Sequence, residues 1–165
     1  MVGITYTEKE IWDFLEQVKD PEVPVLSVVD LGIIRSVSSD ENGWTVVITP
    51  TYSGCPAMRT IEKEIEDMFL ENRINLNKIV TVLSPAWTTD WISEKGRENL
   101  RAYGIAPPEN EVDKSVLFAT PTVIPCPKCS SRNTKMVSEF GSTACKAHYQ
   151  CEDCLEPFDY FKCLK

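Results

Sequence analysis

The sequence predicts an α+β protein in which a small two-layer α/β domain with a mixed sheet precedes a C-terminal zinc ribbon. Two observations predict this class. Residues 1–105 show helical and strand patterns in the order helix, strand, strand, helix, strand, helix. Residues 126–165 hold six of the seven cysteines, including two CxxC pairs with 21 residues between them. So short a segment buries too little apolar surface to fold alone, so a bound metal is expected to stabilise it.

The predicted domains are residues 1–105 for the α/β domain, residues 106–124 for a linker and residues 125–165 for the ribbon. The linker is indicated by Pro107, Pro108 and the polar residues after them. Within this segment, residues 115–119 have the composition of a strand that joins or docks the ribbon.

The N-terminal helix is expected to begin at a capping box, with Thr7 as the N-cap and Glu10 reaching back to it. We expect the helix to end near Lys19, because Pro21 disfavours helical geometry in the residue before it. An extended loop over residues 20–25 follows, since it contains two prolines in four residues.

Three strands are expected in this domain. Residues 27–37 combine a turn with the first strand, and the pair Asn42-Gly43 is a hairpin signal before a returning strand over residues 44–49. Residues 79–83 have the composition of the third strand.

Two further helices complete the domain. Pro56 suits the first helical position, which places Cys55 at the N-cap of a helix that runs to about Leu70. The last helix is expected from residue 89 or 90 to residue 103, with Gly104 as its C-cap.

The bulk properties are those of a soluble globular protein of 165 residues, with 42% hydrophobic and 25% charged residues. No apolar run approaches the roughly 20 residues that span a bilayer, so no membrane contact is expected. The N-terminus lacks the pattern of a signal peptide, which favours the cytoplasm. In that reducing compartment, CxxC pairs indicate metal or redox chemistry rather than disulfides.

The net charge of −8 is concentrated in the first part of the chain. Residues 126–165 carry six basic and five acidic side chains, whereas residues 1–125 carry 11 basic and 20 acidic ones. An acidic body is a poor electrostatic match for a phosphate backbone, so nucleic acid is not an expected partner.

The two CxxC pairs form the clearest candidate site. Four thiolates at this spacing can converge on one tetrahedral ion, and a site filled entirely by protein ligands is structural rather than catalytic. Zinc is the expected metal, while rubredoxin-like iron uses similar ligands. The four predicted ligands are Cys126, Cys129, Cys151 and Cys154.

Cys145 and Cys163 are surplus to this set. Either they pack in the core of the small ribbon, as buried free cysteines do, or they contribute to a second thiolate site or substitute for one of the four ligands. The only histidine, His148, is expected to be a surface or packing residue, because four thiolates are already available.

Cys55 lies outside the ribbon. At a helix N-terminus, free N–H groups and the macrodipole favour the thiolate form, which suits reaction or a soft metal. The alternative is a small capping residue beneath a packed loop. By themselves, Asp20, Glu22 and Asp30 are expected to be solvated turn residues and offer a weak case for acid–base chemistry.

Two sets of motifs lie along the chain. The first set is Asp20-Pro21-Glu22-Val23-Pro24, Asp30-Leu31-Gly32-Ile33-Ile34, Thr49-Pro50-Thr51 and Gly54-Cys55-Pro56. This set resembles the metal–sulfur cluster biosynthesis domain family, which includes SufT and the eukaryotic cytosolic Fe–S targeting factors.

The second set is Ser84-Pro85-Ala86-Trp87-Thr88-Thr89-Asp90-Trp91, Phe140-Gly141-Ser142-Thr143-Ala144-Cys145-Lys146-Ala147 and Glu156-Pro157-Phe158-Asp159-Tyr160-Phe161-Lys162-Cys163. This set is similar to a narrower group, the PaaD proteins encoded with phenylacetyl-CoA epoxidase. The resemblance covers nearly the whole chain.

The resemblance implies an accessory factor, not an enzyme, that assembles or delivers an Fe–S cluster for the epoxidase of aerobic phenylacetate degradation. Its implied partners are the epoxidase components, above all the reductase with its plant-type [2Fe–2S] centre. Cys55 falls where the family keeps a reactive cysteine, Asp20 and Glu22 fall in the signature loop, and Thr49 lies near a strand end. A transient Fe–S cluster is the implied cargo, and a homodimer sharing one cluster is left open. The alternative is a non-catalytic docking subunit of the oxygenase complex.

Overall fold

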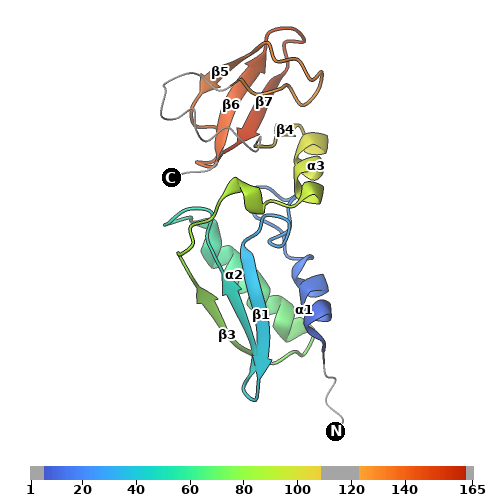
Figure 1. The fold of residues 1–165 in the computed structure, drawn as a ribbon, viewed down its shortest axis with the longest axis vertical. Coiled ribbons are helices and arrows are strands. Elements are labelled where there is room, and N and C mark those ends of the chain that lie inside the picture. The colour runs from blue at the N-terminus through green and yellow to red at the C-terminus, as the bar shows by residue number, and fades with distance from the viewer. Residues whose placement is uncertain (1–5, 109–122, 163–165) are drawn as a thin grey trace. The chain divides into compact units, whose positions relative to one another are not determined.

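A computed structural model describes residues 6–108 and 123–162 of the chain. These residues form two compact units, Met1–Ser93 and Glu94–Lys165, each with its own sheet (Figure 1). Among the helices that the structure describes, none combines the length and apolar character needed to cross a membrane. The predicted α+β class is confirmed, because helices and mixed sheets are both present together with a C-terminal cysteine cluster.

Helix α1, Glu8–Leu15, begins at the predicted capping box. The Thr7 hydroxyl accepts a hydrogen bond from the Glu10 N–H at 3.3 Å, and the Glu10 carboxylate accepts one from the Thr7 N–H at 2.7 Å. The helix ends earlier than the prediction near Lys19. Lys19 instead forms an isolated antiparallel bridge with Ser27, which requires extended backbone.

The first unit contains a mixed three-stranded sheet, as predicted. Strand β1, Ile34–Asp40, pairs antiparallel with β2, Gly43–Ile48, and β2 pairs parallel with β3, Leu76–Thr81. The hairpin between β1 and β2 closes where Asp40 faces Gly43. The parallel pair needs a crossover, which the helix α2, Ala57–Glu71, supplies.

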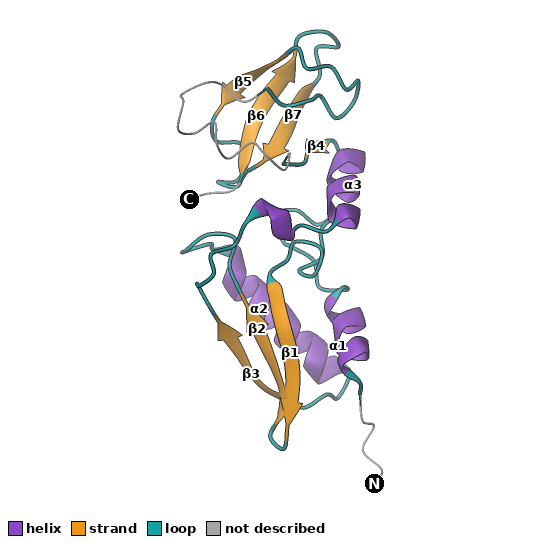
Figure 2. Ribbon diagram, viewed as in Figure 1, coloured by secondary structure: helices purple, strands orange, loops and turns teal. Residues whose placement is uncertain are grey.

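Helix α2 lies across one face of this sheet (Figure 2) and buries an apolar stripe that includes Ile61, Ile65 and Phe69. Its N-cap is Pro56, one residue later than predicted, and Pro56 already has helical backbone angles. Cys55 therefore lies just outside the helix rather than at its cap.

The predicted helix over residues 89–103 is interrupted. A short 3-10 helix, η1, Thr89–Trp91, is followed by extended backbone at Ile92 and then by α3, Glu94–Tyr103. The buried residue Asp30 explains the break, because its carbonyl accepts the Ser93 N–H and its carboxylate accepts the Ser93 hydroxyl, both at 2.8 Å.

The second unit comprises α3, a short strand and the ribbon. Gly104, at φ +88°, ends α3 as predicted, and β4, Ile105–Ala106, follows directly. Strand β4 pairs parallel with β7, Pro157–Phe161, and the sheet continues through β6, Lys146–Cys151, to β5, Thr134–Ser138.

The domain boundary predicted after residue 105 differs from the compact division after Ser93. The difference arises because β4 is a strand of the ribbon sheet, so α3 and β4 group with the ribbon. Residues 109–122 of the predicted linker, including the expected strand at 115–119, lie outside the described residues.

Gly32 provides a test of the turn that holds Asp30. It has φ +74°, and a Cβ there would lie 2.5 Å from the Trp91 carbonyl oxygen. We expect Gly32→Ala to lower the free energy of unfolding by about 3 kcal/mol, from backbone strain and overpacking together. Urea unfolding followed by tryptophan fluorescence measures this change.

Gly54 is the matched control, because it has φ +86° and open space around its missing Cβ. Gly54→Ala should cost only the strain, about 1 kcal/mol. Equal losses for the two variants would show that the approach of Trp91 does not constrain residue 32.

Candidate metal centre

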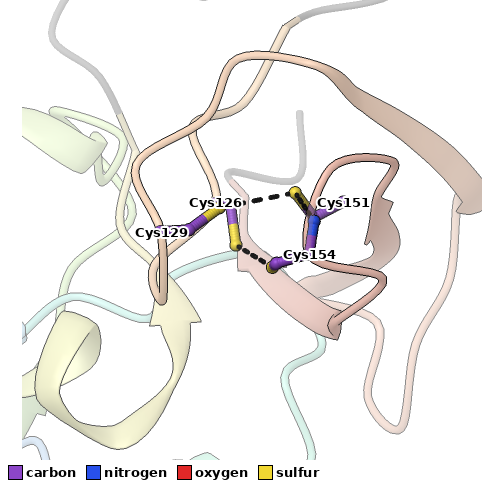
Figure 3. Close-up of side chains that lie close together, drawn as sticks. All are labelled: Cys126, Cys129, Cys151 and Cys154. Carbon is purple, nitrogen blue, oxygen red and sulfur yellow. Dashed lines mark hydrogen bonds between the residues drawn. The ribbon is translucent and has the colours of Figure 1, made fainter.

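Two short loops carry the paired cysteines, and we name each by its six residues. The first knuckle, residues 126–131, precedes β5, and the second knuckle, residues 151–156, connects β6 to β7. All four sulfur atoms lie within 4.8 Å of one another (Figure 3). The structure thus brings together the four cysteines that the spacing singled out, although the two pairs are far apart in sequence.

The sulfur–sulfur distances fit one tetrahedral ion. The Sγ atoms of Cys126 and Cys154 lie 3.8 Å apart, and those of Cys129 and Cys151 lie 3.6 Å apart. Four thiolates at metal–sulfur bonds of about 2.3 Å stand about 3.8 Å apart in a tetrahedron. A disulfide would require about 2.05 Å, and the cysteines that the structure describes are free thiols.

The knuckles have the same backbone design. The N–H of each first cysteine donates to the carbonyl five residues later, from Cys126 to Ser131 and from Cys151 to Glu156, both at 2.9 Å. The residue after each second cysteine has φ +62°, in the left-handed region that glycine favours. Ser130 and Leu155 occupy these positions, and nothing in their residue types signals this conformation.

Two of the thiols are buried and two are exposed. Cys126 and Cys151 belong to the apolar core of the ribbon, where they pack with Tyr149 and Phe158, whereas Cys129 and Cys154 lie at the surface. Since four protein thiolates fill a tetrahedral site, no coordination position is left for a substrate. The arrangement can hold a metal but is not built to turn over a ligand.

Hydrogen bonds differentiate the thiols before a metal binds. The Cys154 N–H donates to the Cys151 sulfur at 3.5 Å, and this bond, with a further one from the Asp153 N–H, lowers the pKa of Cys151 to about 7. The Ser131 N–H lowers the pKa of Cys129, but the neighbouring thiols and desolvation outweigh it and raise that pKa to about 12. Cys151 is therefore better prepared than Cys129 to receive a metal ion at neutral pH.

Cys145 and His148 are not members of this cluster. The buried Cys145 has its sulfur 3.1 Å from the Thr143 hydroxyl, and His148 Nδ1 lies 3.3 Å from the Asp159 carboxylate on β7. Cys163 lies outside the described residues, so its predicted role stays a prediction.

In the first unit, Cys55 is a half-buried free thiol on the loop between β2 and α2. Its N–H donates to the Tyr52 carbonyl at 3.2 Å, and its own carbonyl accepts the Met58 N–H at 3.3 Å. The backbone of Cys55 is thereby fixed at both ends.

Two of the predicted loop carboxylates are buried, so the expectation that they are solvated is wrong. Asp20 Oδ1 accepts hydrogen bonds from the N–H groups of Glu22 and Val23, both at 2.8 Å, and so closes the turn at the Pro21 loop. Asp30 is 2% exposed and accepts from the Ser27 hydroxyl at 2.9 Å. Glu22, by contrast, is half-buried.

Thr49 directly follows β2 and is 1% exposed. Among the described residues, its side-chain oxygen is a buried atom without a hydrogen-bond partner. Such atoms are rare in folded proteins and call for an explanation beyond packing.

Known proteins resemble both halves of the chain. Residues 8–71 match the iron–sulfur cluster assembly protein family, and residues 110–162 match the PaaD zinc beta ribbon domain. In solved structures, the chain is similar to a domain of unknown function from Bacillus anthracis, at 28% identity and TM-score 0.53 over 56% of this chain and 90% of that one. A conserved hypothetical protein from Thermotoga maritima aligns at 26% identity and TM-score 0.50, over 58% of this chain and 95% of that one.

Two curated relatives extend this likeness. An Fe–S protein maturation auxiliary factor from Porphyromonas gingivalis is 37% identical over 54% of this chain and 86% of its own. A putative subunit of 1,2-phenylacetyl-CoA epoxidase from Escherichia coli is 48% identical over 94% of this chain and 92% of its own. The chain therefore belongs to the PaaD family, which joins an iron–sulfur cluster assembly domain to a zinc beta ribbon.

Proposed function

We propose that this protein is a non-catalytic accessory factor that assembles or delivers an Fe–S cluster for a phenylacetyl-CoA epoxidase system. The observation that carries the proposal is the likeness, over nearly all of both chains, to a protein named as a putative subunit of that epoxidase. The partial likeness to an Fe–S protein maturation auxiliary factor supports the cluster-related role of the first unit. We take the reductase component, with the [2Fe–2S] centre that the family resemblance implies, as the client.

In this proposal Cys55 is the transient ligand of the cluster in transit. Its thiol is free and half-buried, which leaves it accessible to a partner, and its backbone is held by Tyr52 and Met58. Thiolate is the ligand that protein-bound Fe–S clusters use. Helix α2 starts two residues later, so Cys55 lies beside the N-terminal end of a helix.

Asp20, Glu22 and Thr49 have supporting roles in the proposal. Asp20 holds the turn of its loop by accepting the Glu22 N–H, and the half-buried Glu22 side chain lies in the same loop. Thr49 begins the segment that ends at Cys55, and its unpaired buried hydroxyl costs about 1–3 kcal/mol relative to a bonded one. That cost is consistent with a residue retained for function rather than for stability.

The ribbon would hold one structural zinc ion. Its four thiols have the number, type and spacing that zinc prefers, and the site is closed. Rubredoxin-like iron would use the same ligands, so metal analysis decides between them.

We expect Cys55→Ala to leave the fold and the ribbon metal intact while lowering Fe–S occupancy of the client reductase at least severalfold, because the transient ligand is lost. Co-expression of the variant with the epoxidase components, followed by iron and sulfide analysis of the purified reductase, measures the effect. Ser53→Ala, at an exposed position of the same loop, is the control. Full cluster occupancy with Cys55→Ala would contradict the proposed ligand.

The alternative function is a docking subunit held permanently in the oxygenase complex. Its distinguishing property is stable co-purification with the epoxidase subunits at equal stoichiometry, which transient delivery does not produce. One cluster for every two chains after anaerobic reconstitution would instead favour a homodimer that shares the cluster.

We expect one zinc ion per chain, and we expect Cys151→Ser to lose it, because a serine hydroxyl replaces a thiolate ligand. Loss of metal should unfold the ribbon, whereas the first unit, with its own core, stays folded. Metal analysis and limited proteolysis follow the two outcomes.

Cys145→Ala is the matched control for this experiment, since its thiol is buried in the same unit but lies outside the cluster. Retention of one zinc ion by this variant would support a packing role for Cys145. Loss of zinc from Cys145→Ala, or its retention by Cys151→Ser, would contradict the assigned ligand set.

A further inference from the structure

We propose that Asp153 and Ser131 form the main arm of a reciprocal latch between the two knuckles, and that this latch slows release of the metal ion. The inference rests on the structural metal of the proposed function. It assigns a role to residues that are not themselves ligands of the metal ion.

The main arm joins the third residue of the second knuckle to the loop that leaves the first. The two carboxylate oxygens of Asp153 are divided between two donors, with Oδ2 accepting from the Ser131 hydroxyl and Oδ1 accepting from the Asn133 amide at 2.7 Å. The Ser131 hydroxyl also accepts the Asn133 N–H at 3.0 Å, so the donors are fixed relative to each other. A main-chain bond from the Glu152 N–H to the Asn133 carbonyl, at 2.8 Å, runs beside this arm.

The second arm is the reverse of the first. Lys128 is the third residue of the first knuckle, and its ammonium lies 2.6 Å from the carboxylate of Glu156, the sixth residue of the second knuckle. In both arms, therefore, the third position of one knuckle binds the sixth position of the other. This relation follows the shared backbone design of the two knuckles.

The two arms differ in expected strength. The side chains of Lys128 and Glu156 are long and are 63% and 40% exposed, and exposed ion pairs of this kind contribute little. Asp153, Ser131 and Asn133 have short side chains that lose less conformational entropy when they are held. Most of the effect should therefore come from Asp153.

The latch acts on metal release because release requires the knuckles to separate. While they remain joined, a thiolate that leaves the ion stays close to it and rebinds, as in any tethered multivalent contact. Charge alone predicts the opposite effect. Four thiolates around a divalent ion carry net negative charge, so removal of the Asp153 carboxylate should favour the bound ion unless the latch dominates.

The test is the rate at which the zinc-loaded full-length chain gives up its ion to an excess of a chromophoric chelator at neutral pH. We expect Asp153→Ala to release zinc about tenfold faster than the wild type, in the range found for residues that support metal ligands. Asp153→Asn and Ser131→Ala each remove only part of the arm and should give intermediate rates. The double variant Ser131→Ala/Asp153→Ala should release zinc no faster than Asp153→Ala alone, because both changes break the same arm.

Glu152→Ala is the matched charge control. It removes a carboxylate from the same interval between Cys151 and Cys154, and the side-chain partner that it loses is the exposed Lys135 at 2.8 Å. Its zinc release should be no faster than that of the wild type. The visible spectrum of the cobalt-substituted variants should also be unchanged, which shows that the ligand geometry is intact.

The possible results distinguish failure of the latch hypothesis from failure of the proposed structural metal site. Wild-type and Asp153→Ala chains that each hold one zinc ion and release it equally fast would overturn the latch alone. Equal acceleration by Glu152→Ala and Asp153→Ala would also overturn it, because faster release would then not depend on the bonds of Asp153 to Ser131 and Asn133. A wild-type chain that takes up no zinc would overturn the structural metal and, with it, the latch.

Discussion

The ribbon depends on two cysteines that serve its apolar core and its metal centre at once. Cys126 and Cys151 are 1% and 0% exposed and pack with Tyr149, Phe158 and Tyr160, yet their sulfur atoms also face the paired thiols of Cys129 and Cys154. A core this small gives little hydrophobic stabilisation, so the bond energy of a metal becomes folding energy. The sheet, the knuckles and the placement of the polar groups around them all follow from that constraint.

Local signals explain what the sequence could predict. Three features were predicted correctly because each depends only on residues that are close together in the sequence. They are the capping box at Thr7, the hairpin before Gly43 and the left-handed Gly104. The cysteine pairs could be predicted for a similar reason, because a CxxC loop holds its two thiols close enough to bind the same metal ion.

What sequence reasoning missed depends on contacts between distant residues. The break between η1 and α3 follows from Asp30, which binds Ser93 from 63 positions away. The burial of Asp20 and Asp30 likewise depends on how their loops fold back, which no local pattern encodes. The hydrogen bonds of Asp153 to Ser131 and Asn133 are also contacts between distant residues, because they join two knuckles that are separated in the sequence.

The protein combines two opposite kinds of thiol in one chain. The four cysteines of the ribbon form a closed set, which suits an ion that remains bound, whereas Cys55 lies outside this set and is half-exposed. Under the proposed function, a factor that handles iron and sulfide would benefit from a structural site that does not exchange with its cargo. The closed coordination of the ribbon would provide this separation, and the proposed latch would add to it by slowing metal release.

The pairing of β4 with β7 determines where the chain can be cut to produce a fragment with an intact ribbon sheet. A fragment cut after residue 105, where the composition changes, would remove α3 and the first of the two residues of β4 from the ribbon. The outer edge of β7 would then present unpaired backbone groups, and exposed strand edges promote aggregation. A cut between Ser93 and Glu94 keeps the four-stranded sheet whole. It is the better joint for chimeras that exchange the cluster-assembly domain of one relative with the ribbon of another.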